Sequence, residues 1–418
     1  MFVSLILLVL ALLGAPLFAV IAAGALMSFV MLDPELGVVV PIEFFSIAEM
    51  PVLLAIPLFT FAGYLLSESQ APRRLVRLTT AILGWMPGGL AIVSLIACAL
   101  FTAFTGASGV TIIALGAILY PALKADGYSD RFNLGLVTAG GSLGLLFAPS
   151  LPLILYGVVA EVSIDDLFIA GILPGMLMIL SLSIWSLWEN RNNRQPLSEF
   201  KLSEVGAALW DAMLELPLPI MVLGGIYSGL LAVSEAAAVT ALYVFVVEVL
   251  IRREITFRRL PEIMRESMVL VGGILLILGA SLASTNYVID AEVPQKLIGL
   301  VSQFVEGRTS FLILLLLFLL LLGAFLDIFS ALVLIVPLIL PVAAEFDVDP
   351  IHLGMIFLAT MQLGYLTPPV GLNLFIASYR FDQSILSVYR ATLPFLLILL
   401  ATVVVIIFWP DLSLFLVK

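Results

Sequence analysis

The chain has 418 residues, of which 62% are hydrophobic and only 11% are charged, and its mean hydropathy is +1.23. These values exclude an ordinary soluble globular domain, in which about half of the residues are apolar and about a quarter are charged. The formal net charge is −11, and the sequence contains no basic patch of the kind that binds nucleic acid. We therefore expect the lipid bilayer to be the main solvent of this protein.

Uncharged apolar runs follow one another along the whole chain. About 20 apolar residues span the hydrocarbon core of a bilayer, and most of the runs reach that length. Apolar and polar residues do not alternate strictly within them, which predicts an all-α polytopic membrane protein rather than an outer-membrane barrel. The first run lacks a basic start and is too long for a signal-peptide core, so we expect an uncleaved first helix. The runs cover residues 1–32, 78–123, 132–160, 167–188, 216–234, 267–289, 309–326, 350–379 and 391–410.

Basic and acidic connections alternate between these runs. Short loops that stay in the cytoplasm carry an excess of Lys and Arg. This rule predicts a cytoplasmic amino terminus, a carboxyl terminus on the outer side and about nine crossings, although Lys296 and Arg308 fall on the outer side. The basic connections are 73–77, 124–131, 191–201, 252–259 and Arg380, and the acidic ones are 33–35, 161–166, 290–292 and 345–349.

Two of the apolar stretches do not fit single crossings. Residues 78–123 begin and end on the predicted cytoplasmic side, with small and polar residues at 105–109 where the chain would turn. Irregular polar backbone at membrane depth is tolerated only where protein or a water cavity surrounds it. The same reasoning applies to 309–344, with a turn near 323–330. Charge alone leaves two crossings and a re-entrant hairpin as alternatives, and amphipathic stretches at 71–82 and 294–305 are typical of helices in the interface plane.

An internal repeat relates the two halves of the chain. The segment LGLLFAP at 143–149 matches LGYLTPP at 363–369 at four positions, and Pro121 and Pro341 keep the same offset of 220 residues. Because the two hairpins would open to opposite sides, the copies are expected to be inverted, as in secondary transporters with broken helices. The expected parts are a first repeat at 1–204 with a hairpin at about 88–123 and a broken helix at about 131–160, a linking helix at 205–231, and a second repeat at 232–418 with a hairpin at about 309–344 and a broken helix at about 350–379.

Several longer motifs point to one family. They are FTGASGVT at 104–111, GSLGLLFAPSLPLILYG at 141–157, GILPG at 171–175, VPQ at 293–295 and LGYLTPPVGLNLF at 363–375. In these motifs and in their order, the chain resembles the large permease subunit of the tripartite ATP-independent periplasmic (TRAP) transporters, the DctM family, within the wider ion-transporter superfamily. The resemblance spans nearly the whole chain, with one departure at Ala148, where many members have proline.

The resemblance implies a secondary transporter in the bacterial inner membrane. A periplasmic binding protein would deliver an organic acid, a small four-helix membrane subunit would brace the large one, and sodium ions would drive uptake by an elevator movement. No part of the chain resembles the small subunit, which we expect to be a separate chain. The alternative is a standalone dicarboxylate or sodium/proton antiporter of the same superfamily. No metal cluster, nucleophile elbow or phosphate-binding loop indicates an enzyme, and we expect no cofactor besides the coupling sodium ions.

Sodium requires several oxygen ligands, and unwound helix ends within the membrane provide free carbonyls and nearby hydroxyls. The alternative for the same small residues is that they permit close helix packing. The candidate sodium ligands are Thr105, Gly106, Ser108, Ser142 and Gly144 in the first half and Gly323, Asp327, Ser330, Gly364, Thr367 and Gly371 in the second.

The organic acid is expected between the two hairpin tips, where the amino termini of half-helices favour a carboxylate. Prolines there leave carbonyls unpaired, and an asparagine can both donate and accept hydrogen bonds. The alternative for the prolines is a structural kink only. The candidate substrate ligands are Pro149, Ser150, Pro152, Pro368 and Asn373.

Asp327 is an isolated carboxylate at the second hairpin tip. Ionisable groups within a membrane are costly and functional by default, so Asp327 is interpreted as a cation ligand, an outward gate or a cap of the following helix. His352, beside Asp349 at a predicted outer boundary, is expected to be solvated. Other acidic residues are expected at the membrane interface or against the partner subunit, namely Glu49, Asp211, Glu215, Glu235 and Glu248.

Overall fold

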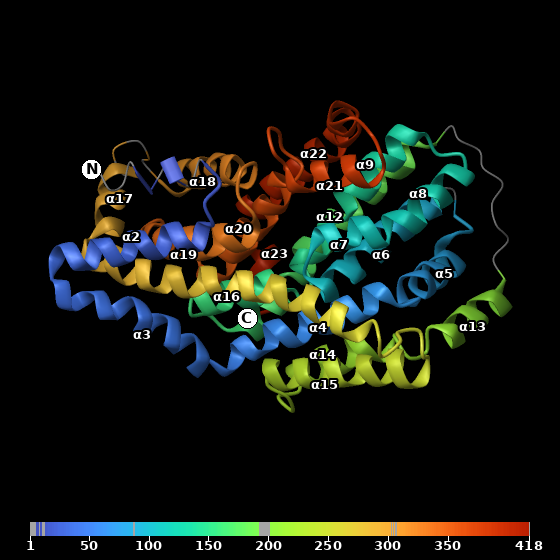
Figure 1. Cartoon of the computed structure of the whole chain (residues 1–418). Helices are drawn as coiled ribbons and strands as arrows, with labels where there is room; N and C mark the ends of the chain where they lie inside the picture. Colours follow the sequence, from blue (N-terminus) through green and yellow to red (C-terminus); the bar gives the residue numbers. More distant parts are fainter. Residues whose placement is uncertain are drawn as a thin grey trace.

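The computed structural model describes residues 6, 7, 9, 10, 13–86, 88–191, 201–301, 303, 305 and 307–417. Every regular element in this part of the chain is a helix (Figure 1). Six helices are long and apolar enough to cross a membrane, or eight if each of two bent pairs counts as one span. The expected all-α polytopic class is therefore confirmed.

The first segment forms part of a framework of long helices. The expected first helix does not run unbroken through the described residues, because α2 begins only after Pro16; residues 1–5 lie outside them. The 31 residues of α16 make it about 46 Å long, and it packs against α2, α3 and α4. The framework helices are α2 (Leu17–Leu32), α3 (Val39–Ser46), α4 (Ala55–Glu68), α14 (Pro217–Tyr227), α15 (Val233–Phe245) and α16 (Leu260–Asp290).

The remaining long helices form a central bundle beside this framework (Figure 1). Its first half begins with a hairpin. The chain reverses after α6 at Gly106, whose φ of +64° lies in the left-handed region that suits glycine. A bend of 49° separates the two helices of the returning arm, and the next helix is broken with a bend of 43°. These elements are α6 (Gly89–Thr105), α7 (Ser108–Ala114), α8 (Gly116–Ala125), α9 (Asp130–Gly140), α10 (Leu151–Val159), α11 (Ile164–Ala170) and α12 (Ile172–Glu189).

The second half of the central bundle has the same order of a hairpin followed by a broken helix. The chain unwinds between Gly364 and Leu372, and the peptide bonds that precede Pro149 and Pro369 are both cis. In Figure 1 the α8 end of the first hairpin lies toward the right, and α17, which leads into the second hairpin, lies toward the left. The elements are α18 (Arg308–Gly323), α19 (Ile328–Glu345), α20 (Pro350–Gly364), α21 (Leu372–Arg380), α22 (Ile385–Phe408) and α23 (Asp411–Leu414).

Two short helices precede the hairpins. Helix α5 (Ala71–Leu83) lies where the first amphipathic stretch is expected, and α17 (Val293–Val301) lies within the second, of which residues 302 and 304 fall outside the described residues. Both join a framework helix to the central bundle, since α5 follows α4 and α17 follows α16. Each is therefore a connecting arm between the two groups of helices.

The expected single linking helix at 205–231 is wrong. The structure has two helices there, α13 (Leu202–Asp211) and α14, with a turn between them. Pro217 has no N–H with which to continue the ladder of α13, and it starts α14 at a position where that N–H would be unpaired in any case. The turn also brings the carboxylate of Glu215 to 2.6 Å from the guanidinium of Arg74.

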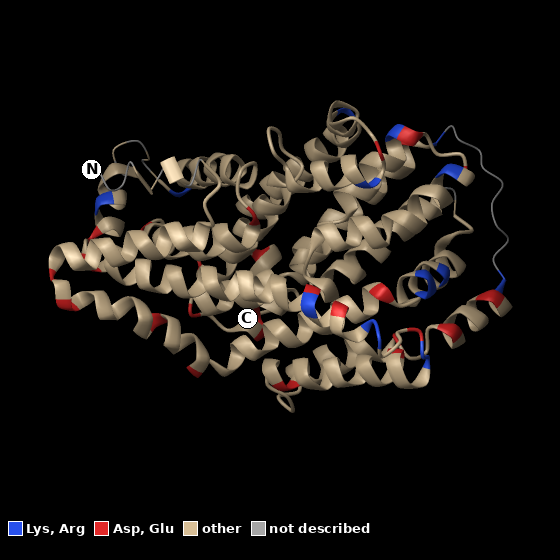
Figure 2. Ribbon diagram, in the orientation of Figure 1, with Lys and Arg blue, Asp and Glu red and all other residues tan. Residues whose placement is uncertain are grey.

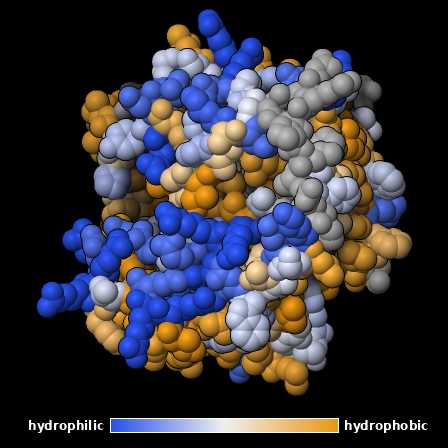
Figure 3. Space-filling view, turned by 90° about the vertical axis from the view of Figure 1, so that its right-hand side faces the viewer, coloured by the Kyte–Doolittle hydropathy of each residue, from blue (hydrophilic) through white to orange (hydrophobic). Residues whose placement is uncertain are grey.

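Charged residues are distributed unevenly over the molecule. Figure 2 shows Lys and Arg concentrated in the right half, around α5, α8 and α9, whereas acidic residues mark the left end at the turn between α2 and α3. The face seen from the right carries a broad hydrophilic patch bordered by hydrophobic surface (Figure 3). A polar end face of this kind suits a protein whose long helices cross a bilayer and whose end meets water.

Candidate functional site

A hydrogen bond joins the first hairpin tip to the second broken helix. The hydroxyl of Ser108, at the start of α7, donates to Oδ1 of Asn373, at the start of α21, over 2.7 Å. The Nδ2 group of Asn373 in turn donates to the carbonyl of Thr138 in α9 over 3.4 Å. All three residues are buried. The structure thus brings together elements of both halves, and it pairs a residue expected to bind sodium with one expected to bind substrate.

Next to this junction lies a cluster of buried hydroxyl groups. The hydroxyl oxygens of Thr102 and Thr111 are 2.7 Å apart, and the Thr102 hydroxyl also lies 2.9 Å from the carbonyl oxygen of Gly141. Thr105 is one helical turn along α6 from Thr102, and Ser142 follows Gly141 in the chain. The sequence interpretation missed Thr102 and Thr111, although their spacing to Thr105 and Ser108 places them on shared helix faces. These oxygens are of the type that coordinates a small cation.

Close packing explains why glycine stands at three of the positions that are expected to bind sodium. A Cβ atom on Gly144 would lie 2.2 Å from the carbonyl oxygen of Ala99 in α6. A Cβ atom on Gly364 would lie 2.4 Å from the backbone of Gly323, at the end of α18. In each half, the backbone of the broken helix therefore touches the backbone of the first hairpin arm. Only glycine, which has no Cβ, allows so close an approach.

Asp327 caps a helix at the second hairpin tip. One of its carboxylate oxygens accepts the N–H groups of Phe329 and Ser330, each over 3.0 Å, and the other accepts the Ser330 hydroxyl. The hydroxyl of Tyr365 accepts the N–H of Ile328 over 2.8 Å, which fastens this tip to the second broken helix. Of the three roles considered for Asp327, the cap of the following helix is the one that these hydrogen bonds support.

The two unwound segments differ in their access to solvent. Pro149, Ser150 and Pro152 are buried, whereas Pro368 is exposed and Thr367 is half-buried. The Ser150 hydroxyl is fully buried and has no hydrogen-bond partner among the residues that the structure describes. An unpaired buried hydroxyl costs about 1–3 kcal/mol, so its presence beside the broken helix marks a position that a polar ligand would complete.

His352 is not solvated, contrary to expectation. Its side chain is 0% exposed, and its two ring nitrogens lie 3.1 Å from the Ser413 hydroxyl and 3.2 Å from the carbonyl oxygen of Ile407. The expectation is wrong because α22 and α23 cover the start of α20. This packing could not be read from the sequence around His352.

Two of the acidic residues expected at an interface are buried within the chain instead. Arg74 on α5 is 6% exposed, and its guanidinium contacts Glu215 at 2.6 Å, Glu248 at 3.3 Å and Glu254 at 2.5 Å. Arg252 lies 3.7 Å from Glu215 as well. Three carboxylates around one buried guanidinium fasten the arm α5 to the framework, since the glutamates come from the turn before α14 and from the chain at the end of α15.

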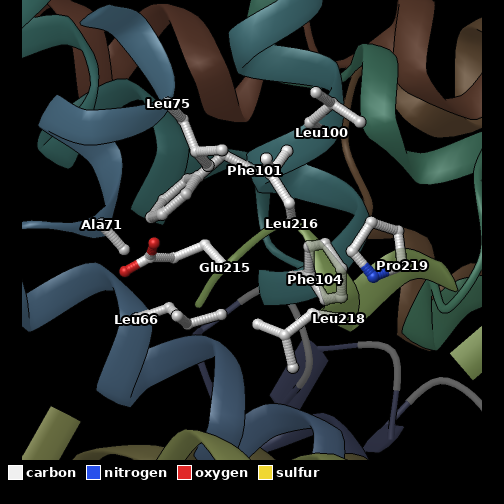
Figure 4. Close-up of a pocket in the computed structure, with 10 residues that line it drawn as sticks. All are labelled: Leu66, Ala71, Leu75, Leu100, Phe101, Phe104, Glu215, Leu216, Leu218 and Pro219. Atoms are coloured by element: carbon white, nitrogen blue, oxygen red, sulfur yellow. The ribbon is translucent and has the colours of Figure 1, made fainter. Parts of the chain in front are cut away.

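An apolar cleft separates the first hairpin from α14. Figure 4 shows one cavity of about 60 Å³, in which Leu100, Phe101 and Phe104 of α6 face Pro219 of α14, with Glu215 at its edge. A second cavity of about 210 Å³ shares Leu100, Phe104 and Pro219 with the first and extends to Ala148 at the first broken helix. In the part of the chain that the structure describes, no group of three His, Cys, Asp or Glu residues could hold a metal ion.

Comparison with known proteins identifies the family. The model of the DctM component of the tripartite ATP-independent periplasmic transporters matches residues 4–412. The C4-dicarboxylate TRAP transporter large permease protein DctM of Pseudomonas aeruginosa is 33% identical, over 94% of this chain and 92% of that protein. The ectoine/5-hydroxyectoine TRAP transporter large permease protein UehC of Ruegeria pomeroyi is 31% identical, over 99% and 97%. The isethionate TRAP transporter permease protein DctMQ of Oleidesulfovibrio alaskensis is 31% identical over 96% of this chain, which spans only 62% of that longer protein.

A solved structure shares the fold. The crystal structure of the YdaH transporter of Alcanivorax borkumensis superposes with a TM-score of 0.60 over 89% of this chain and 87% of that one, at 15% sequence identity. The relatives are permease subunits of transporters and not enzymes. The chain is therefore a multi-pass integral membrane protein that belongs to the family of TRAP transporter large permease subunits.

Proposed function

We propose that this chain is the large permease subunit of a sodium-driven TRAP transporter that imports an organic acid into a bacterium across the inner membrane. The observation that carries the proposal is the junction of Ser108 with Asn373, where the first hairpin tip meets the second broken helix. Substrate sites at the meeting point of broken helices are typical of secondary transporters. The family assignment supports two partners, a small membrane subunit and a periplasmic binding protein.

The organic acid binds between the two unwound segments. Helices α10 and α21 both begin there, and their amino termini carry partial positive charge toward an anion. Ser150 precedes α10 and supplies an unpaired hydroxyl, and Asn373 supplies an amide that is already oriented by Ser108 and Thr138. The relatives are named as transporters of C4-dicarboxylates, isethionate and ectoine, so a small organic acid is the class that fits the site.

Sodium binds beside the substrate at the hairpin tips. In the first half, the hydroxyls of Thr102, Thr105, Thr111 and Ser142 and the Gly141 carbonyl provide oxygens within a buried cluster. In the second half, the unwound segment contributes Thr367 and the carbonyls around it. Gly144, Gly323 and Gly364 allow the close packing of the tips, and their backbone carbonyls are candidate sodium ligands as well.

Transport proceeds by an elevator movement of the central bundle against the framework. The arms α5 and α17 connect the two groups of helices, and the cleft between α6 and α14 is lined mainly by apolar side chains, which suits a surface along which helices slide. The concentration of Lys and Arg in the right half of Figure 2 supports a cytoplasmic position for that end. The cytoplasmic amino terminus and the periplasmic carboxyl terminus, which are expected from the charged connections along the sequence, stay predictions.

The experiment is uptake of a labelled organic acid by proteoliposomes that hold this chain with its small partner subunit, in the presence of the binding protein and a sodium gradient. Ser108→Ala and Asn373→Ala are expected to lower uptake at least tenfold, because each removes one side of the junction. Ser181→Ala is the matched control, since the Ser181 hydroxyl bonds the Leu177 carbonyl in α12 and no other residue that the structure describes. Full uptake by both junction variants would overturn the assignment of the site.

A further inference from the structure

A basic cavity lies on the central bundle away from the proposed transport site. It has a volume of about 330 Å³ and opens between the helices α8, α9 and α22. We call it the basic cavity and define it by Tyr120, Asp130, Arg131, Gln383, Ser387 and Arg390. Neither the junction of Ser108 with Asn373 nor the hydroxyl cluster contributes to its walls.

A proline in α22 fixes one of the two arginines at the cavity. Pro394 lacks an N–H group, so the carbonyl of Arg390, four residues earlier, has no partner within the helix. The Nε and Nη2 groups of Arg131 donate to that carbonyl over 3.2 Å and 2.9 Å. A guanidinium has five N–H donors, and the Nη1 group of Arg131 bonds no other residue that the structure describes. Arg131 is therefore held in place with donors left for a ligand.

The charge in the basic cavity is positive. Asp130 supplies a carboxylate to its walls, and this carboxylate already lies 3.0 Å from the ammonium group of Lys124 and accepts the Tyr120 hydroxyl over 3.4 Å. In the described part of the chain, neither Arg131 nor Arg390 contacts a carboxylate within ion-pair distance. Two guanidiniums without counter-charge at one cavity suit a phosphate group, which arginine binds in a bidentate manner.

An apolar stripe leads from this cavity along α22. The helix has 24 residues and is about 36 Å long, slightly more than the roughly 30 Å hydrocarbon core of a bilayer. Arg390 lies in its second turn and thus near the headgroup level. Leu393 and Leu397, which follow at the spacing of one helix face, are 50% and 56% exposed. A ligand that matches both features carries an anionic head and an apolar tail.

We propose that the basic cavity binds the phosphate group of an anionic phospholipid, whose acyl chain lies along Leu393 and Leu397. Basic pockets between transmembrane helices are suited to such headgroups. On the other side of Arg131, a cavity of about 210 Å³ contains the carboxylate of Glu189. That charge repels a phosphate and keeps it on the side of Gln383 and Ser387.

The test is lipid binding by the delipidated full chain in detergent, measured by native mass spectrometry. The probes are phosphatidylglycerol, zwitterionic phosphatidylethanolamine and inorganic phosphate. Wild type is expected to prefer phosphatidylglycerol over phosphatidylethanolamine. Arg390→Gln is expected to lower phosphatidylglycerol binding about tenfold, since it removes a guanidinium that forms no hydrogen bond or ion pair with the residues that the structure describes.

Two further variants complete the test of the basic cavity. Ser387→Glu places a carboxylate in the basic cavity from an exposed position and is expected to lower phosphatidylglycerol binding to a similar extent. Arg265→Gln, at an exposed arginine on α16, is the matched control and is expected to bind like wild type. Unchanged binding by both Arg390→Gln and Ser387→Glu would overturn the proposal. Displacement of phosphatidylglycerol by millimolar inorganic phosphate would also overturn it, by showing a site for a free anion.

Discussion

Replacement of Arg74 by methionine is expected to detach the arm α5 from the framework. The guanidinium is 6% exposed and contacts three glutamates, of which Glu248 is fully buried. Methionine keeps the unbranched apolar stem but has no charge, so the carboxylates are left in a buried site with only Arg252 nearby. Removal of one partner from a buried ion pair costs about 3–5 kcal/mol, because the remaining charge has lost its compensation.

This cost is measurable as a loss of thermal stability in detergent. We expect the apparent melting temperature of Arg74→Met to fall by about 6–10 °C, if each kcal/mol lowers it by roughly 2 °C in a large protein. The triple variant Arg74→Met, Glu215→Gln, Glu248→Gln is expected to recover most of this loss, because neutral groups of similar shape replace the ions. An unchanged melting temperature for Arg74→Met would refute the reasoning, and so would a triple variant that is as unstable as the single one.

The same cluster sets a dependence on pH. Burial alone would raise the pKa of Glu254, but hydrogen bonds from the Arg74 side chain and the Gln70 N–H outweigh it and hold this pKa below its ordinary value of 4.5. Since the carboxylate form is favoured in the folded state, its contribution to stability is fully present above pH 4.5 and is lost as the pH falls through the lower folded value. Glu254→Gln is therefore expected to flatten the fall of the melting temperature below pH 4.5 relative to wild type.

Three further substitutions test individual positions. Gly364→Ala is expected to destabilise the protein by about 1–3 kcal/mol, because the new Cβ would lie 2.4 Å from the backbone of Gly323. Its control is Gly272→Ala on α16, where a Cβ meets nothing within 4 Å, so this substitution is expected to be neutral or stabilising. Full stability of Gly364→Ala would contradict the close packing. His352→Leu removes two hydrogen bonds and is therefore expected to lower the free energy of unfolding by about 1–3 kcal/mol. The pH profile of uptake is expected to stay unchanged, and a shifted profile would give this buried imidazole a role in proton coupling. Ser150→Ala is expected to keep or raise the melting temperature, because it removes a buried hydroxyl that has no partner among the described residues, and to raise the KM for substrate; an unchanged KM would remove Ser150 from the site.

The helical class was predictable because membrane solvation imposes it on local sequence. Runs of about 20 apolar residues must form helices that satisfy their own backbone, and the small and polar residues around Gly106 mark a place where such a helix turns. Asp327 was recognisable as a cap, since an acidic residue before an apolar run is a local signal. The inversion of the two halves and the ligands at the site stay predictions.

The features that the sequence did not reveal depend on contacts between distant residues. Arg74 meets Glu215, Glu248 and Glu254 across 141–180 positions of the chain, and a charge pattern along the sequence does not indicate such a meeting. His352 was expected in water because the two residues that its ring nitrogens contact come 55 and 61 positions later in the chain. Thr102 and Thr111 gave a weaker signal than the glycines, since a threonine within an apolar helix usually bonds its own backbone.

The most direct test of the central claim is the dependence of uptake on its two partners and on sodium. Proteoliposomes that hold this chain and its small subunit would be given a labelled organic acid with and without the binding protein, and with an inward sodium gradient or none. Uptake is expected only when the binding protein and the sodium gradient are both present. Uptake by this chain alone, without a binding protein, would contradict the tripartite account and indicate a standalone transporter.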